Sequence, residues 1–162
     1  MKLQNLKDCF VTKISALHDI ETQITKALPK AIKGAKNKAL KDALTDHLKE
    51  TKEHVARLEQ IFKTLELKPM KIKVEAIRGL ADDTAWVLDQ SGTPEALDSL
   101  LISSLQYVEH YEIAGYKAAI SWAEALELSS ASELLQMTLA EEENADSTLG
   151  DIAEGINGEV AE

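Results

Sequence analysis

The stretch LAEEENADSTL (residues 139–149) carries three consecutive glutamates and an aspartate within a segment whose apolar residues follow helical spacing. At about 100° per residue, Glu142 and Asp146 fall within the apolar stripe, Glu143 lies at its edge and Glu141 points well away from it. The stripe comprises Leu135, Leu139, Leu149 and Ala153. A buried carboxylate without a partner is costly. The stretch is therefore either a solvated face or a set of metal ligands turned toward a shared interior.

Size and composition are those of a single domain spanning residues 1–162. No apolar run approaches the roughly 20 residues of a membrane span, and the first ten residues have no apolar signal core. The lone cysteine, Cys9, cannot form an internal disulfide. These features predict a cytoplasmic protein that contacts no membrane. The net charge of −10 argues against nucleic-acid binding.

Charge is divided unevenly along the chain. Of the 18 basic residues, only Lys117 follows Arg78, whereas most of the 28 acidic residues lie after that position. Both signs are spread through periodic segments. This pattern favours two helical halves of opposite charge that attract each other.

Apolar residues recur at intervals of three and four, and the chain has only three prolines and seven glycines, so an all-α fold is predicted. The expected helices cover about 3–28, 38–67, 74–90, 94–126 and 130–154. Pro29 and Gly34 mark the end of the first, Thr93 caps the fourth, and Gly155 and Gly158 end the fifth. Short connections predict two antiparallel hairpins. The segment 68–93 is long enough to join them into one four-helix bundle with a short extra helix in the connection.

Each of the other long helices also carries a carboxylate on or near its apolar face. Glu21 lies on the face of the first helix, Glu112 lies on that of the fourth, and Glu109 is at the edge of the latter. Glu50 and His54 flank the face of the second helix, one turn apart. A shared divalent metal site would satisfy these groups together.

The spacing of these residues suggests an internal duplication. Glu21 precedes Glu50 by 29 residues, and Glu112 precedes Glu142 by 30. In each pair a further ligand, His54 or Asp146, follows four residues after the second acid. Two such units related by a pseudo-twofold axis would surround two metal ions.

Several stretches resemble the ferritin-like superfamily and, more closely, the YciF/YciE-like family of bacterial stress proteins. They are IETQITKALPK (20–30), HLKETKEHVARLEQIF (47–62), VEHYEIAGY (108–116) and TLAEEENAD (138–146). The resemblance implies a ferritin-like four-helix bundle with a crossover helix, a tendency to form homodimers, and a role in stress.

The resemblance also implies a ligand set of Glu21, Glu50, Glu109, Glu112, Glu142 and Glu143. The superfamily pattern Glu-x-x-His is not kept, because Glu53 and Ala145 stand where the histidines are expected. His54 and Asp146, each one position later, are the expected substitutes, and His47 is a further candidate. So oxygen-rich a site suits two iron or manganese ions.

Two functions from different classes remain open. In the first, a di-iron or di-manganese carboxylate protein binds dioxygen or peroxide at open metal positions and oxidises iron or consumes peroxide. In the second, a non-catalytic dimeric helical bundle acts through its surface, and its metal site is structural or empty. Of the aromatic residues, Tyr116 alone is expected to contact a ligand, while Trp86, Tyr107 and Tyr111 are expected in the core or at an interface.

Overall fold

A computed structural model describes residues 3–161, and in this part of the chain it contains five α-helices and no strand. In chain order the helices are α1 (Leu6–Gly34), α2 (Lys38–Thr64), α3 (Glu75–Leu88), α4 (Pro94–Ala125) and α5 (Ser129–Val160). The all-α prediction is confirmed, and the short helix lies between the two pairs of long helices.

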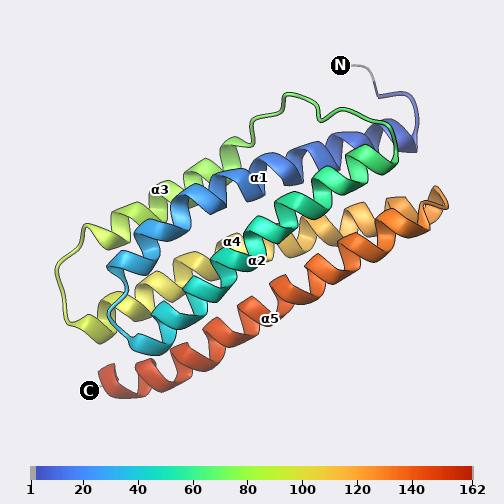
Figure 1. The fold of residues 1–162 in the computed structure, drawn as a ribbon. Coiled ribbons are helices and arrows are strands. Elements are labelled where there is room, and N and C mark those ends of the chain that lie inside the picture. The colour runs from blue at the N-terminus through green and yellow to red at the C-terminus, as the bar shows by residue number, and fades with distance from the viewer. Residues whose placement is uncertain (1–2, 162) are drawn as a thin grey trace.

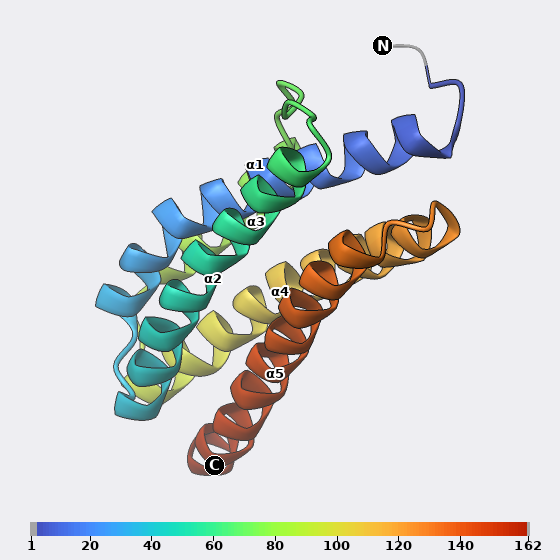
Figure 2. The same ribbon diagram turned by 45° about the vertical axis from the view of Figure 1, so that its right-hand side comes forward.

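The four long helices lie side by side around one interior (Figures 1 and 2). Helix α1 packs against α2 and α4, and α5 packs against the same two helices, so each long helix has two long neighbours. Neighbouring helices run in opposite directions (Figure 1). The segment 65–74 and α3 return the chain along α1 to the end of the bundle where α2 begins, and α3 covers α1 and α4.

Local sequence explains where several helices begin and end. The hydroxyl of Thr93 accepts a hydrogen bond from the backbone of α4, and Pro94 occupies the first turn, as predicted. Helices α2 and α4 each end just before a glutamate in the left-handed region, Glu66 with φ 53° and Glu127 with φ 58°. This conformation ends the helix and lets the chain reverse direction.

Two helix ends differ from the prediction. Helix α1 continues through Pro29 to Gly34 instead of ending near residue 28. A proline this close to the end of a helix removes one hydrogen bond, and the buried residues of the last turns keep the helix packed. Helix α5 continues through Gly155 and Gly158 to Val160 instead of ending near residue 154. Ile156 is buried there, and its packing outweighs a cost of about 1 kcal/mol for each glycine.

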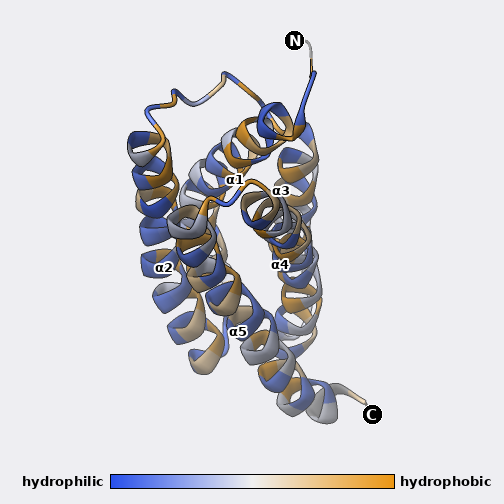
Figure 3. Cartoon of the chain, turned by 90° about the vertical axis from the view of Figure 1, so that its right-hand side faces the viewer, coloured by the Kyte–Doolittle hydropathy of each residue, from blue (hydrophilic) through white to orange (hydrophobic). Residues whose placement is uncertain are grey.

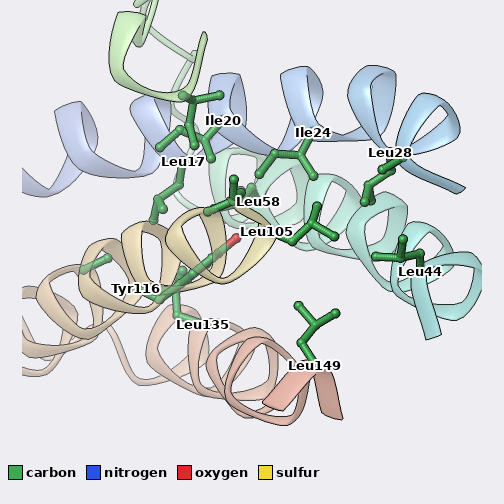
Figure 4. Packing of buried hydrophobic residues seen from close by; sticks show 14 of the residues in the cluster. Leu17, Ile20, Ile24, Leu28, Leu44, Leu58, Leu105, Tyr116, Leu135 and Leu149 are labelled. Atoms are coloured by element: carbon green, nitrogen blue, oxygen red, sulfur yellow. The ribbon is translucent and has the colours of Figure 1, made fainter. Parts of the chain in front are cut away.

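Each long helix turns one apolar stripe inward, so hydrophobic and hydrophilic residues alternate along every ribbon (Figure 3). Leucine and isoleucine from all four long helices fill the interior (Figure 4). None of the helices in residues 3–161 is both long and apolar enough to cross a bilayer.

One buried acid, Asp98 of α4, holds the connection between α1 and α2. Its side chain is 2 % exposed. Its carboxylate accepts hydrogen bonds from the backbone N–H of Lys36, at 2.9 and 3.0 Å, and from that of Asn37. The second hairpin thereby supplies the negative charge that favours the start of α2.

We expect Asp98→Ala to destabilise the protein by about 2–4 kcal/mol, because two backbone N–H groups lose their acceptor in a buried place. Urea unfolding followed by circular dichroism measures the change. The matched control is Asp42→Ala, because Asp42 is exposed and forms a surface pair with Lys38, and its loss should cost less than about 0.5 kcal/mol. Equal costs for the two variants would contradict a capping role for Asp98.

Candidate metal centre

At mid-length, the long helices enclose six acidic and histidine side chains, each at most 5 % exposed. They are Glu21 of α1, His47 and His54 of α2, Glu109 and Glu112 of α4, and Glu142 of α5. Helical geometry accounts for the placement, since residues separated by three or seven positions share a helix face. The bundle interior is therefore interrupted by one polar layer.

The first group in this layer is Glu21, His54 and Glu142, whose ligand atoms all lie within 4.8 Å of one another. His54 Nδ1 lies 3.0 Å from Glu142 Oε1 and 3.4 Å from Glu21 Oε1. The buried Tyr116 donates its hydroxyl hydrogen to Glu21 Oε1. Three helices besides α2 thus meet around the His54 ring.

The second group is His47, Glu109 and Glu142, with ligand atoms within the same 4.8 Å. His47 Nε2 lies 3.3 Å from Glu109 Oε1 and 4.0 Å from Glu142 Oε2. Glu142 therefore belongs to both groups, and a different oxygen of its carboxylate faces each histidine. A carboxylate placed in this way can bridge two cations.

Glu112 is completely buried beside these groups. Burial raises its pKa well above 4.5, and the nearby Glu142, Glu21 and Glu109 raise it further. Burial also raises the pKa of Glu21 and of Glu142, although contacts with His54 act in the opposite direction. Without a cation, the apolar surroundings thus disfavour the charged form of these acids.

The pKa values of the two histidines are also raised, although burial acts on a histidine in the opposite direction. Burial alone lowers the pKa of His54, but its contacts with Glu142 and Glu21 outweigh burial and raise the value to about 10. The pKa of His47 is raised for the same kind of reason, because the effects of Glu109 and Glu50 exceed that of burial. In the absence of metal, both imidazoles therefore hold a proton at neutral pH.

Several ligand atoms of the layer have no hydrogen-bond partner among the described residues. Both oxygens of Glu112 are in this state, whereas those of Glu142 and the ring nitrogens of His47 have only the histidine–carboxylate contacts described above, without good hydrogen-bond geometry. Buried polar atoms are normally paired, and leaving them unpaired is costly. These oxygen and nitrogen donors suit a divalent transition metal, so the buried groups could hold metal ions.

A supporting interaction fixes the orientation of the His54 ring. His54 Nε2 lies 2.8 Å from Glu141 Oε2, and Arg57 Nη2 donates to Glu141 Oε1 at 2.9 Å. Such a carboxylate partner holds the Nε2 hydrogen and leaves Nδ1 directed into the first group. The expectation that Glu141 points away into solvent is wrong, because α2 lies across this flank of α5 and presents Arg57 and His54 to it.

Four of the predicted ligands belong to neither group. Glu112 is buried beside the two groups, and the other three lie at the edge of the layer or outside it. Glu50 is 38 % exposed, and its Oε2 lies 3.8 Å from His47 Nδ1 at the edge of the layer. Glu143 is half exposed and pairs with Lys117 at 2.7 Å. Asp146 lies against α4, where it is 3.3 Å from His110 Nε2 and accepts a hydrogen bond from Gln106.

These placements leave the two hairpins unequal. The first hairpin supplies both histidines, whereas α5 supplies Glu142 as its one buried acid in the layer. The sequence predicted Glu50 and His54 as the ligands from α2. In the structure His47, rather than Glu50, contacts Glu109. The seven-residue spacing of His47 and His54, two helical turns, was the signal that both face the interior.

Comparisons with known proteins agree with this architecture. Residues 5–162 match the profile of a family described as Domain of unknown function (DUF892). The protein YciF of Escherichia coli K12 is 34 % identical over 154 residues, which cover 94 % of this chain and 93 % of YciF. The crystal structure of the E. coli stress protein YciF superposes with a TM-score of 0.93 at 33 % identity, covering 96 % of this chain and 99 % of that one. YcfI of Rhodopseudomonas palustris gives a TM-score of 0.88 at 37 % identity, covering 92 % and 95 %.

We expect Glu112→Gln to stabilise the metal-free protein. A carboxyl whose pKa is raised by folding contributes least at high pH, because stability is lost as pH rises from 4.5 through the raised value. The free energy of unfolding of Glu112→Gln should therefore exceed that of the wild type only slightly near pH 5. At pH 8 the difference should reach about 1–2 kcal/mol, which corresponds to about 3–6 °C in Tm.

Thermal unfolding of chelator-treated protein at both pH values measures this difference. Glu143→Gln is the matched control, because it removes an exposed acid of α5 and should change Tm little at either pH. A Glu112→Gln variant that is less stable than the wild type at pH 8 would show that the carboxylate is needed for the apo fold.

Proposed function

This chain belongs to the DUF892 family, and we propose that it is a ferritin-like carboxylate protein that holds two divalent metal ions, iron or manganese, within a single four-helix domain spanning residues 1–162. We further propose that it acts in the cytoplasm during oxidative or general stress, with dioxygen or peroxide as the molecule reduced. The description of its E. coli relative as a stress protein supports the biological setting.

The observation that carries the proposal is the placement of Glu142. Its side chain is fully buried, and it directs one oxygen toward each histidine without a hydrogen bond of good geometry to any described residue. Two cations would neutralise the surrounding acids and complete the coordination of both oxygens. This arrangement matches the way that helical bundles host paired metals, with inward carboxylates and histidines from facing helices.

The protein residues have separable roles in such a site. His54 and Glu21 would hold one ion, His47 and Glu109 the other, and Glu142 would bridge them, with Glu112 beside the bridge. Glu141 and Tyr116 would orient His54 and Glu21 through hydrogen bonds. When bound, the paired ions would supply the redox change that dioxygen or peroxide reduction requires.

We expect protein purified from cells supplemented with iron and manganese to contain about two metal ions per chain, as measured by mass spectrometry. The double variant Glu112→Ala plus Glu142→Ala should retain less than about 0.2 per chain, because the bridge and its neighbour are lost. The exposed pair Glu133→Ala plus Glu143→Ala on the surface of α5 is the matched control and should keep the wild-type content.

Bound metal should also stabilise the fold, by about 2.7 kcal/mol when its free concentration is a hundred times Kd. A chelator should accordingly lower Tm in the wild type and leave the double variant unchanged. A wild-type metal content as low as that of the double variant would overturn the metal-binding proposal. Full metal content without consumption of peroxide or oxidation of ferrous iron would assign the ions a structural role.

A second candidate function, a dimeric interaction protein, is favoured by an exposed apolar face on α4. Leu100, Tyr107 and Tyr111 are 44 %, 63 % and 39 % exposed, and their spacing places them on one side of the helix. Trp86 of α3 is also exposed, at 59 %. Large aromatic side chains are enriched in the contacts between protein chains. We propose that this face of α4 joins two copies of the chain in a homodimer.

We expect the purified protein to elute as a dimer, and Tyr107→Glu, which introduces charge on this face, to shift it toward the monomer. Size-exclusion chromatography with light scattering gives the mass of each species. Met137→Glu is a matched control, because Met137 is a similarly exposed apolar residue on α5. A dimer that persists in Tyr107→Glu plus Tyr111→Glu places the interface elsewhere, and a wild-type monomer excludes the homodimer.

A further inference from the structure

A cavity of about 250 Å³ leads from the surface between α2 and α5 to the second group of the polar layer. Its outer part is lined by the acids Asp46 and Glu50 of α2, and its inner part includes His47 and Glu109. Asp46 is exposed, whereas Glu109 is 2 % exposed. Negatively charged groups therefore line the path from solvent to buried ligand atoms.

The inner residues of the cavity have unpaired polar atoms. Oε2 of Glu109 lacks a hydrogen-bond partner among residues 3–161, and the ring nitrogens of His47 form no hydrogen bond of good geometry there. The His47 ring also spans the boundary of the layer, since Nδ1 lies 3.8 Å from the half-exposed Glu50 and Nε2 lies 3.3 Å from the buried Glu109. One side chain thus contacts both the outer and the inner acid.

The small side chain of Ala145 keeps this cavity open. Ala145 lines it on the α5 side, one turn after Glu142, and is only partly buried. A larger residue at this position would extend into the space between α2 and α5. Ala145, which stands where the superfamily pattern has a metal-binding histidine, therefore leaves space for a passage to the polar layer.

A second cavity, of about 340 Å³ between α1, α3 and α4, also reaches Glu109 but differs in character. Its walls are mainly aliphatic, and its charged lining residues are the bases Lys26, Lys30 and Arg78 and the acids Asp82 and Glu109, so bases outnumber acids. Basic residues repel divalent cations, and aliphatic walls offer them no ligands. The charges of the lining residues therefore favour passage of a divalent cation through the cavity between α2 and α5.

We propose that the cavity between α2 and α5 is the entrance through which divalent cations reach the metal centre. Glu50 attracts the ion, His47 transfers it to Glu109 and Glu142, and the fully buried group of Glu21, His54 and Glu142 is filled afterwards through the shared Glu142. This inference rests on the proposed metal-binding function, but it concerns the rate and route of loading rather than the capacity of the site.

The test is stopped-flow uptake of cobalt(II), which is divalent and absorbs visible light when bound, by metal-free full-length protein. Ala145→Leu fills the entrance without changing a ligand, and Ala27→Leu makes the same substitution in the wall of the second cavity. We expect Ala145→Leu to slow uptake at least about tenfold, because α2 and α5 must separate for each ion. The final amount of bound cobalt(II) should equal that of the wild type, and Ala27→Leu should load at the wild-type rate.

Thr148→Leu, in the same wall one turn away, repeats the test if Ala145→Leu does not fold. Uptake that is slowed by Ala27→Leu and not by Ala145→Leu would overturn the proposal in favour of the second cavity. Bound cobalt(II) with unchanged rates in all variants would overturn the entrance while leaving the metal site intact. A wild type that binds no cobalt(II) at equilibrium would overturn the proposed function together with the entrance.

Discussion

Glu142 lies between two histidines, with one carboxylate oxygen 3.0 Å from His54 Nδ1 and the other 4.0 Å from His47 Nε2. This one side chain joins α5 to α2 at two points separated by two helical turns. Three further glutamates lie around it in a space that is otherwise apolar. Such a concentration of carboxyl groups is unfavourable unless protons or cations neutralise it. The clustered carboxyl groups thus lower the stability of the metal-free fold and raise its affinity for cations.

Much of this arrangement could be predicted from the sequence, because helical periodicity is a strong signal over long segments. The all-α class and the cap at Thr93 followed from the spacing of apolar residues and from turn chemistry. Helical phase placed Glu21, Glu112 and Glu142 on inward faces, and all three are fully buried. Phase was not sufficient for every acid, because it also placed Asp146 within the stripe, and Asp146 instead contacts His110 and Gln106 of α4.

Residues at the edge of a stripe could not be placed in this way. The inward face of α2 includes His47, Thr51 and His54, whereas phase had put Glu50 with His54. The predicted and observed inward faces of α2 differ by a modest rotation of the helix about its axis. This rotation depends on how α2 packs against α1 and α5, and the sequence of α2 alone does not determine it. Glu141 was missed for a related reason, because its partner Arg57 lies 84 positions earlier in the chain. The ends of α1 and α5 likewise depend on tertiary burial, which outweighs local proline and glycine preferences.

Apolar residues lie toward both ends of the interior, with Leu28, Leu44 and Leu149 toward one end and Leu17, Tyr116 and Leu135 toward the other (Figure 4). The polar layer lies at mid-length among these residues. Apolar contacts alone specify the axial alignment of packed helices less sharply than buried polar groups do. A slide of α5 by a single turn, about 5.4 Å, would separate Glu142 from at least one histidine and carry a carboxylate toward the leucines. The same layer therefore fixes the axial alignment of the helices, as single polar residues do in coiled coils.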